Sequence, residues 1–99
     1  MARVGGTGAE AEATEEIAAI CEGVREAAQA HSDQPFTQFT AVRFTQQVVA
    51  GTNYFVKVQT GDASFAHVRV HKPLPHTGAP PSVASIKLGQ TADSPIEYF

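Results

Sequence analysis

The sequence predicts an α+β fold, in which one long helix packs on an antiparallel β-sheet. A single amphipathic stretch at residues 15–31 is followed by three strand-like runs at residues 39–49, 53–60 and 64–71. The runs are separated by short spacers, so we expect consecutive strands to be antiparallel neighbours. A helix with one apolar face and a sheet with one apolar face bury both by packing together, which gives this fold class.

The predicted helix has recognisable ends. Thr14 is a suitable N-cap, and Glu15 and Glu16 suit the positive end of the helix dipole. The helix is expected to run to about His31, because Pro35 and the polar residues before it do not continue it. Apolar residues recur at three- and four-residue spacing and define the face toward the core: Ile17, Ile20, Cys21, Val24 and Ala28.

The strand runs alternate in polarity, and this indicates which face the helix covers. Apolar side chains of the second and third runs share one face of the predicted sheet, and we expect the helix there: Tyr54, Val56, Val58, Val68 and Val70. Residues 73–95 contain five prolines and little periodicity, so they are expected to be mostly loop. Residues 96–99 are expected to form a short final strand, with Ile96 and Tyr98 on one face.

Length and composition indicate one domain at 1–99, with a flexible arm at 1–13 that is rich in Ala, Gly, Glu and Thr. The net charge of −3 does not favour nucleic acid, and no apolar run is long enough to span a membrane. One cysteine forms no internal disulfide, and no secretory signal is recognisable. These features favour a cytoplasmic protein, small enough at 10.5 kDa to diffuse into the nucleus as well.

The stretch Gln47-Val48-Val49-Ala50-Gly51 lies between two strand runs and is predicted to be a hairpin tip. Gly51 lies where the chain reverses, since a residue without Cβ adopts positive φ at little cost. Tips are usually polar, whereas this one is apolar and uncharged. Either a partner covers Val48 and Val49, or both valines fold back into the core.

A second apolar residue lies on the proline-rich loop. Leu74 stands between Pro73 and Pro75, which fix the backbone and keep it out of a central strand. An aliphatic side chain on a stiff loop is a pre-organised contact for a partner. The alternative is that Leu74 packs beneath its own loop.

The sequence offers little for catalysis, metal or cofactor binding. Cys21 with one of the four histidines is the only nucleophile–base pairing, and Cys21 lies on the apolar face of the helix. His67 and His71 are about 13 Å apart along one strand, too far to chelate one ion together. We therefore expect no enzyme, no metal site and no cofactor.

The hairpin motif resembles the Gln-x-Val-x-Gly hairpin of the cystatins. The longer run from Gln47 to Val58 resembles the stefins, the small intracellular cystatins. Further matches are spread over nearly the whole chain: Gly5, Phe36, Phe39, Ala41, Val42, Phe44, His67, Arg69, Val70, Leu74-Pro75-His76 and Tyr98-Phe99.

This resemblance implies a cystatin fold with a curved sheet, and reversible, tight inhibition of papain-like cysteine proteases such as lysosomal cathepsins. It implies a wedge made of the arm and two hairpin loops that fills the active-site cleft. In the arm, Val4 would enter a substrate pocket and Gly5 would turn the chain away from the nucleophile; Gly6 leaves a second register open. The remaining contacts implied are Gln47, Val48, Val49, Ala50, Gly51, Leu74, Pro75 and His76.

Two alternatives remain open at this stage. The first hairpin joins two strong strands through a tight tip, an element that can be exchanged between copies, so a domain-swapped dimer is one alternative. Straightening the tip would remove the inhibitory loop, so the monomer would be the active form. The other alternative is a cystatin fold that binds a partner other than a protease.

Overall fold

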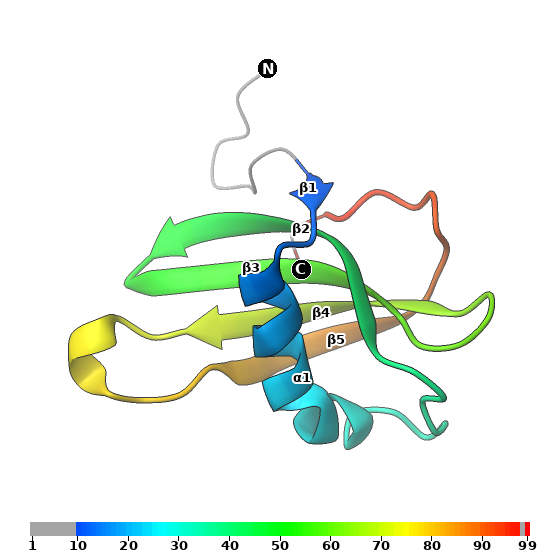
Figure 1. The fold of residues 1–99 in the computed structure, drawn as a ribbon, viewed down its shortest axis with the longest axis horizontal. Helices are drawn as coiled ribbons and strands as arrows, with labels where there is room; N and C mark the ends of the chain where they lie inside the picture. The colour runs from blue at the N-terminus through cyan, green and yellow to red at the C-terminus, as the bar shows by residue number, and fades with distance from the viewer. Residues whose placement is uncertain (1–9, 98) are drawn as a thin grey trace.

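A computed structural model describes residues 10–97 and 99 of the chain. Within these residues, seven elements follow one another (Figure 1). They are β1 (Ala11–Glu12), α1 (Glu15–Gln29), β2 (Thr40–Val49), β3 (Gly51–Gln59), β4 (Phe65–Lys72), the 3-10 helix η1 (Pro75–Thr77) and β5 (Ser82–Gln90).

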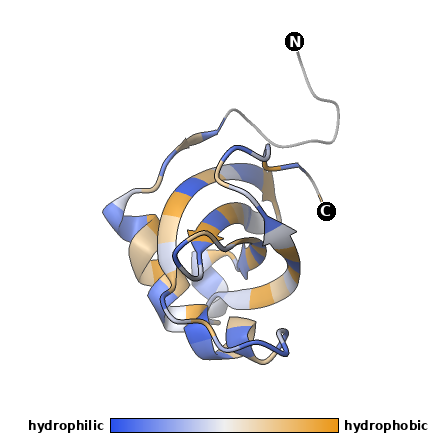
Figure 2. Ribbon diagram, turned by 90° about the vertical axis from the view of Figure 1, so that its right-hand side faces the viewer, coloured by the Kyte–Doolittle hydropathy of each residue, from blue (hydrophilic) through white to orange (hydrophobic). Residues whose placement is uncertain are grey.

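The strands form one antiparallel sheet in the order β1-β2-β3-β4-β5. The sheet is strongly curved (Figure 2), and α1 crosses one of its faces (Figure 1). We call this the inner face and the opposite one the outer face. The observed arrangement of one helix on an antiparallel sheet confirms the predicted fold class.

The helix begins as the sequence predicts. The Oγ1 atom of Thr14 accepts a hydrogen bond from the backbone N–H of Ile17 at 3.2 Å. The helix ends at Gln29, two residues before the expected His31. The side chain of Gln29 donates to the carbonyl of Gln34 and accepts from the N–H of Phe36, both at 2.8 Å, and so holds the turn that follows the helix.

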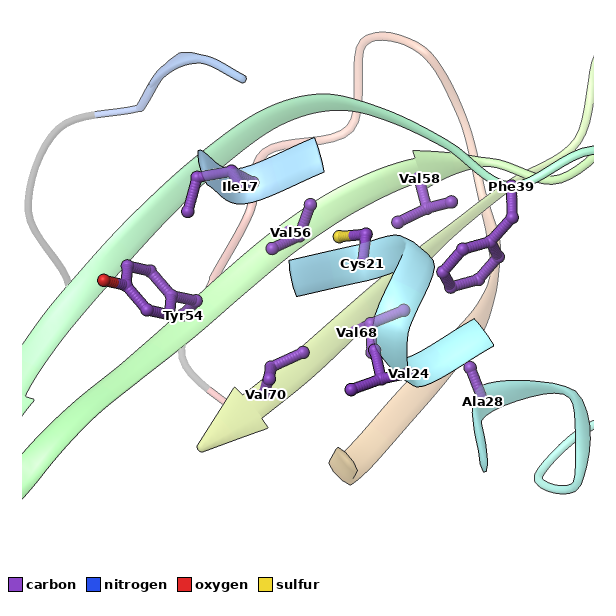
Figure 3. Packing of buried hydrophobic residues seen from close by; sticks show 10 residues of the cluster. All are labelled: Ile17, Cys21, Val24, Ala28, Phe39, Tyr54, Val56, Val58, Val68 and Val70. Atoms are coloured by element: carbon purple, nitrogen blue, oxygen red, sulfur yellow. The ribbon is translucent and has the colours of Figure 1, made fainter. Parts of the chain in front are cut away.

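The main core lies between α1 and the inner face, where the sequence placed it. Ile17, Cys21, Val24 and Ala28 of the helix point toward the strands (Figure 3). The strand residues of this cluster include the five predicted ones: Tyr54, Val56, Val58, Val68 and Val70. Burial of these apolar side chains is the main stabilising contribution to the fold.

The expectation that residues 73–95 are mostly loop is wrong, because Ser82–Gln90 form β5 at the sheet edge. Two register shifts hide this strand from a period-two search. Val83 is opposite Val70 and Ile86 is opposite Val68, so both pack on the core although they are three residues apart. A bulge between them restores the face that simple alternation would have lost.

The expectation of a final strand at residues 96–99 is also wrong for the described residues 96, 97 and 99, which belong to no strand. Ile96 is nevertheless buried, with 1% of its surface exposed. The segment after β5 crosses the outer face and is held there by side chains of β3 and β4 rather than by strand pairing. The first part of its path, from the right-hand end of β5 back toward the sheet, is visible in Figure 1.

The stretch predicted as a flexible arm, 1–13, ends in structure. Ala11 is paired with Phe44 and Glu12 with Arg43, and the N–H of Ala13 donates to the carbonyl of Val42 at 3.0 Å. The final residues of the predicted arm therefore form an edge strand. Val4 and Gly5 lie outside the described residues.

Candidate functional site

The β2–β3 hairpin narrows to a very tight tip. Val49 is paired with Gly51, so Ala50 alone lies between the two strands. Val48 is 76% exposed and Val49 is 45% exposed. Of the two alternatives left by the sequence, folding of both valines into the core is therefore wrong, and the tip presents apolar side chains to solvent.

Gly51 is the residue that this geometry requires. Its φ is +102°, a conformation that residues with a Cβ rarely adopt. A Cβ built there would overlap the carbonyl oxygen of Lys72 and would lie 3.2 Å from Cα of Pro73. The tip of the first hairpin therefore lies against the backbone that leads from β4 into the second loop.

The second loop is ordered by its own hydrogen bonds. The carbonyl of Leu74 accepts from the N–H of Thr77 at 3.1 Å and from its Oγ1 at 2.8 Å. The N–H of Gly78 donates to the carbonyl of Pro75 at 3.2 Å. Pro75 and His76 thus lie in a short 3-10 helix, and Leu74 just before it is 39% exposed rather than packed under the loop.

The described members of the predicted contact set gather at one end of the sheet. The β2–β3 tip and the loop after β4 project side by side on the left of Figure 1. Gln47 lies at the base of the first tip, opposite Asn53. We name this region, formed by residues 47–51 and 74–76, the apolar edge. It protrudes, and a protruding apolar shape suits insertion into the cleft of a partner.

A buried lysine on the outer face was not anticipated from the sequence. Lys57 is 1% exposed, and its Nζ donates to the carbonyl oxygens of Thr91, Ala92 and Ser94 at 2.6, 2.9 and 2.6 Å. Burial lowers the pKa of Lys57, while the carboxylates of Glu10 and Asp93 act in the opposite direction. The alternation along β3 places Lys57 correctly on the outer face. No pattern in the neighbouring sequence indicates that the C-terminal segment covers it.

His67 lies opposite Lys57 and is also buried. Its Nε2 atom has no hydrogen-bond partner within the part of the chain described by the structure. Burial, with the nearby Lys57 ammonium as the next cause, lowers the pKa of His67 to about 4. His67 is therefore a neutral structural residue at pH 7.

Glu10 joins both ends of the described chain. Its Oε2 accepts from the N–H of Ile96 at 2.9 Å, and its Oε1 lies 3.5 Å from Nε of Arg43 on β2. Glu10, which directly precedes β1, is thus bonded both to the C-terminal segment and to β2. This anchor lies immediately after residues 1–9.

In the part of the chain that the structure describes, Cys21 is not placed to act as a nucleophile. Cys21 is 1% exposed, and burial together with the Glu22 carboxylate raises the pKa of its thiol to about 12, which disfavours the nucleophilic thiolate. Residues 10–97 and 99 contain no cluster of three potential metal-ligating side chains. None of the helices in that part is long and apolar enough to cross a membrane.

Comparison with known proteins settles the family. Residues 7–82 match the cystatin domain family. The chain belongs to the cystatin family. It is 40% identical to the cystatin-B of Macaca fuscata fuscata and 39% identical to that of Homo sapiens, each over 88% of this chain and 89% of the relative. It is 37% identical to the cystatin-B of Paralichthys olivaceus, over 96% of this chain and 97% of the relative.

Family membership gives the general function. This cystatin is a cysteine protease inhibitor and not an enzyme, and its partners are cysteine proteases. The apolar edge contains at its first tip the stretch Gln47–Gly51, which resembles the cystatin hairpin motif.

Proposed function

We propose that the chain inhibits papain-like cysteine proteases reversibly, by inserting the apolar edge into the active-site cleft. The observation that carries this proposal is the joint exposure of Val48, Val49 and Leu74 on two tight turns at one end of the sheet. A soluble domain gains nothing for its own stability from three exposed aliphatic side chains at such a place, whereas a partner surface desolvates them.

Rigidity of the edge supports tight binding. The first turn is held by strand pairing and by Gly51 at positive φ. The second is held by the hydrogen bonds of η1, by Gly78 at positive φ and by Pro75. Side chains and loops that are ordered before binding lose little further entropy on binding. An interface of about 1,600 Å² in total is therefore sufficient for a tight complex without any covalent bond.

The arm completes the proposed wedge. Val4 would occupy a substrate pocket and Gly5 would turn the chain away, so that no peptide bond meets the protease thiolate. Glu10 and β1, which are bonded to the rest of the domain, would anchor the C-terminal end of this arm. We further propose lysosomal cathepsins as the protease class and the cytoplasm as the setting.

Titration of a fixed concentration of papain with the purified monomer tests the proposal. We expect residual activity to fall to zero near one inhibitor per enzyme and to recover on dilution or on competition by substrate. Absence of inhibition at micromolar concentration by a folded monomer would contradict it.

The tight first tip also favours a second candidate, a domain-swapped dimer. The β2–β3 ladder runs from Thr40 to Val49, and only Ala50 separates the strands, so opening this one turn would part β2 from β3 and let each strand pair with the other strand of a second copy. The exchanged form would lose the first tip and with it the inhibition. Separation by size-exclusion chromatography, with a papain assay on each peak, distinguishes the forms: an inactive dimer supports this candidate, and equally active peaks exclude exchange through this hairpin.

A further inference from the structure

A row of polar side chains crosses the outer face directly behind the first tip. Gln47 of β2 is opposite Asn53 of β3, which is opposite His71 of β4. The Nδ2 atom of Asn53 donates a long hydrogen bond, of 3.4 Å, to Oε1 of Gln47. The Oδ1 atom of Asn53 lies 2.9 Å from Nδ1 of His71. Asn53 is 5% exposed, so its polar groups depend on these neighbours.

The position of His71 connects this row to the tip. With Oδ1 of Asn53 as acceptor, His71 donates through Nδ1–H. A Cβ built at Gly51 would lie 3.3 Å from Cε1 of His71, so the imidazole packs against the tip glycine. The His71 side chain therefore contacts the turn of the first hairpin and is also hydrogen-bonded to Asn53 of β3.

His71 also lies just before the second tip. Lys72 and Pro73 follow it and pass against Gly51, and Leu74 comes next. The contacts of Asn53 and His71 thus join the base of the first turn to the strand that leads into the second. These are the contacts best placed to fix how the two turns stand relative to each other.

We propose that Asn53 and His71 are positioning residues for inhibition. They hold the two turns of the apolar edge in one relative geometry, so that Val49 and Leu74 meet the protease together. This inference rests on the proposed function, and neither side chain is assigned a contact with the protease. Without the row, the backbone ladder still joins β3 to β4, but the relative geometry of the two turns is less restricted and more of it must be ordered on binding, which weakens the complex.

The test compares Asn53→Ala with Gln59→Ala. Gln59 lies on the same face at the other end of β3, and its side-chain amide donates to the carbonyl of Asp62 at 3.1 Å. We expect Asn53→Ala to raise the inhibition constant for papain about tenfold, the size of one lost buried bond. NMR relaxation should show new motion at the amides of Val48 to Ala50. Gln59→Ala should leave both readouts unchanged.

Further variants separate positioning from general stability. Asn53→Asp keeps the acceptor for His71 and should recover most of the inhibition. His71→Ala removes the same bond at a half-buried position and tests the proposal independently if Asn53→Ala does not fold. The loss of inhibition in the double variant should not exceed the larger of the two single losses, because the two residues act through one bond.

The outcomes distinguish the two proposals. Failure of the folded wild-type monomer to inhibit papain overturns the proposed function. Normal wild-type inhibition that is unchanged in Asn53→Ala or in His71→Ala overturns the positioning role alone. Losses that simply add in the double variant also overturn it, because they would show two independent effects.

Discussion

The Nζ atom of Lys57 lies 2.6 Å from the carbonyl oxygen of Ser94, so the middle strand of the sheet holds the C-terminal segment across its outer face. Two further carbonyl bonds, to Thr91 and Ala92, complete the contact. The sheet is therefore covered on both faces, by α1 on the inner face and by this segment on the outer.

Replacing Lys57 by Met should destabilise the fold and release the C-terminal segment. The variant keeps the aliphatic volume but removes every one of these charge-assisted bonds, so we expect a loss of about 2 kcal/mol in the free energy of unfolding. Urea denaturation and hydrogen exchange at residues 91–97 measure the two effects. Lys87→Met, at an exposed lysine of β5, is the matched control and should change neither. Equal effects of both variants would show that Lys57 is not a specific anchor.

Replacing Glu10 by Ala should loosen the junction of the two chain ends. The N–H of Ile96 loses its acceptor and Arg43 its ion pair, at a cost of about 1 kcal/mol. We expect faster hydrogen exchange at Ile96. The control is Glu12→Ala, an exposed glutamate on β1 for which exchange at Ile96 should stay slow. Unchanged protection of Ile96 in Glu10→Ala would rule out the junction.

His67 should make stability depend on pH. Its pKa in the fold, about 4, is lower than the value of 6.5 expected for the unfolded chain, so the unfolded chain binds the proton more readily. The free energy of unfolding should therefore fall as the pH drops from about 6.5 to about 4, by up to about 3 kcal/mol. Denaturation at several pH values measures this, with His67→Phe as the comparison. An equally steep decline in His67→Phe would assign the pH dependence to other groups.

Gly51→Ala should damage the first tip more than a positive φ alone explains. Gly51 and Gly78 both have positive φ, but a Cβ at Gly78 meets open space whereas one at Gly51 overlaps the backbone of Lys72. We expect a loss of about 1 kcal/mol for Gly78→Ala and clearly more for Gly51→Ala. Thermal unfolding of the two variants, side by side, measures the difference. Equal losses of stability in the two variants would mean that the close approach of Gly51 to Lys72 adds nothing to the cost of a Cβ.

Much of the fold could be predicted because it follows from local patterns. The cap at Thr14, the spacing from Ile17 to Ala28 and the alternation along β3 are all readable within a few residues. Strand β5 was missed because a bulge places Val83 and Ile86 on one face at a spacing that alternation forbids.

The outer face was missed for another reason. Lys57 and His67 are polar, and polar residues in a strand usually indicate a solvent-facing side. The burial of Lys57 depends on contacts with residues more than thirty positions away, such as Ser94. No window along the sequence contains that information. The motif at Gln47–Gly51, by contrast, was visible, whereas the row of Asn53 and His71 that supports it appears only once the strands are in register.

The most direct test of the central claim compares inhibition of papain by Val49→Asp and by Leu88→Asp. Val49 and Leu88 are both aliphatic and both 45% exposed, but only Val49 lies on the apolar edge. If the edge enters the cleft, Val49→Asp should raise the inhibition constant at least tenfold, since burial of a carboxylate costs more than about 1.4 kcal/mol. Leu88→Asp should inhibit like the wild type. Unchanged inhibition by Val49→Asp with a native circular dichroism spectrum would contradict the account. An equal loss of inhibition in both variants would contradict it as well.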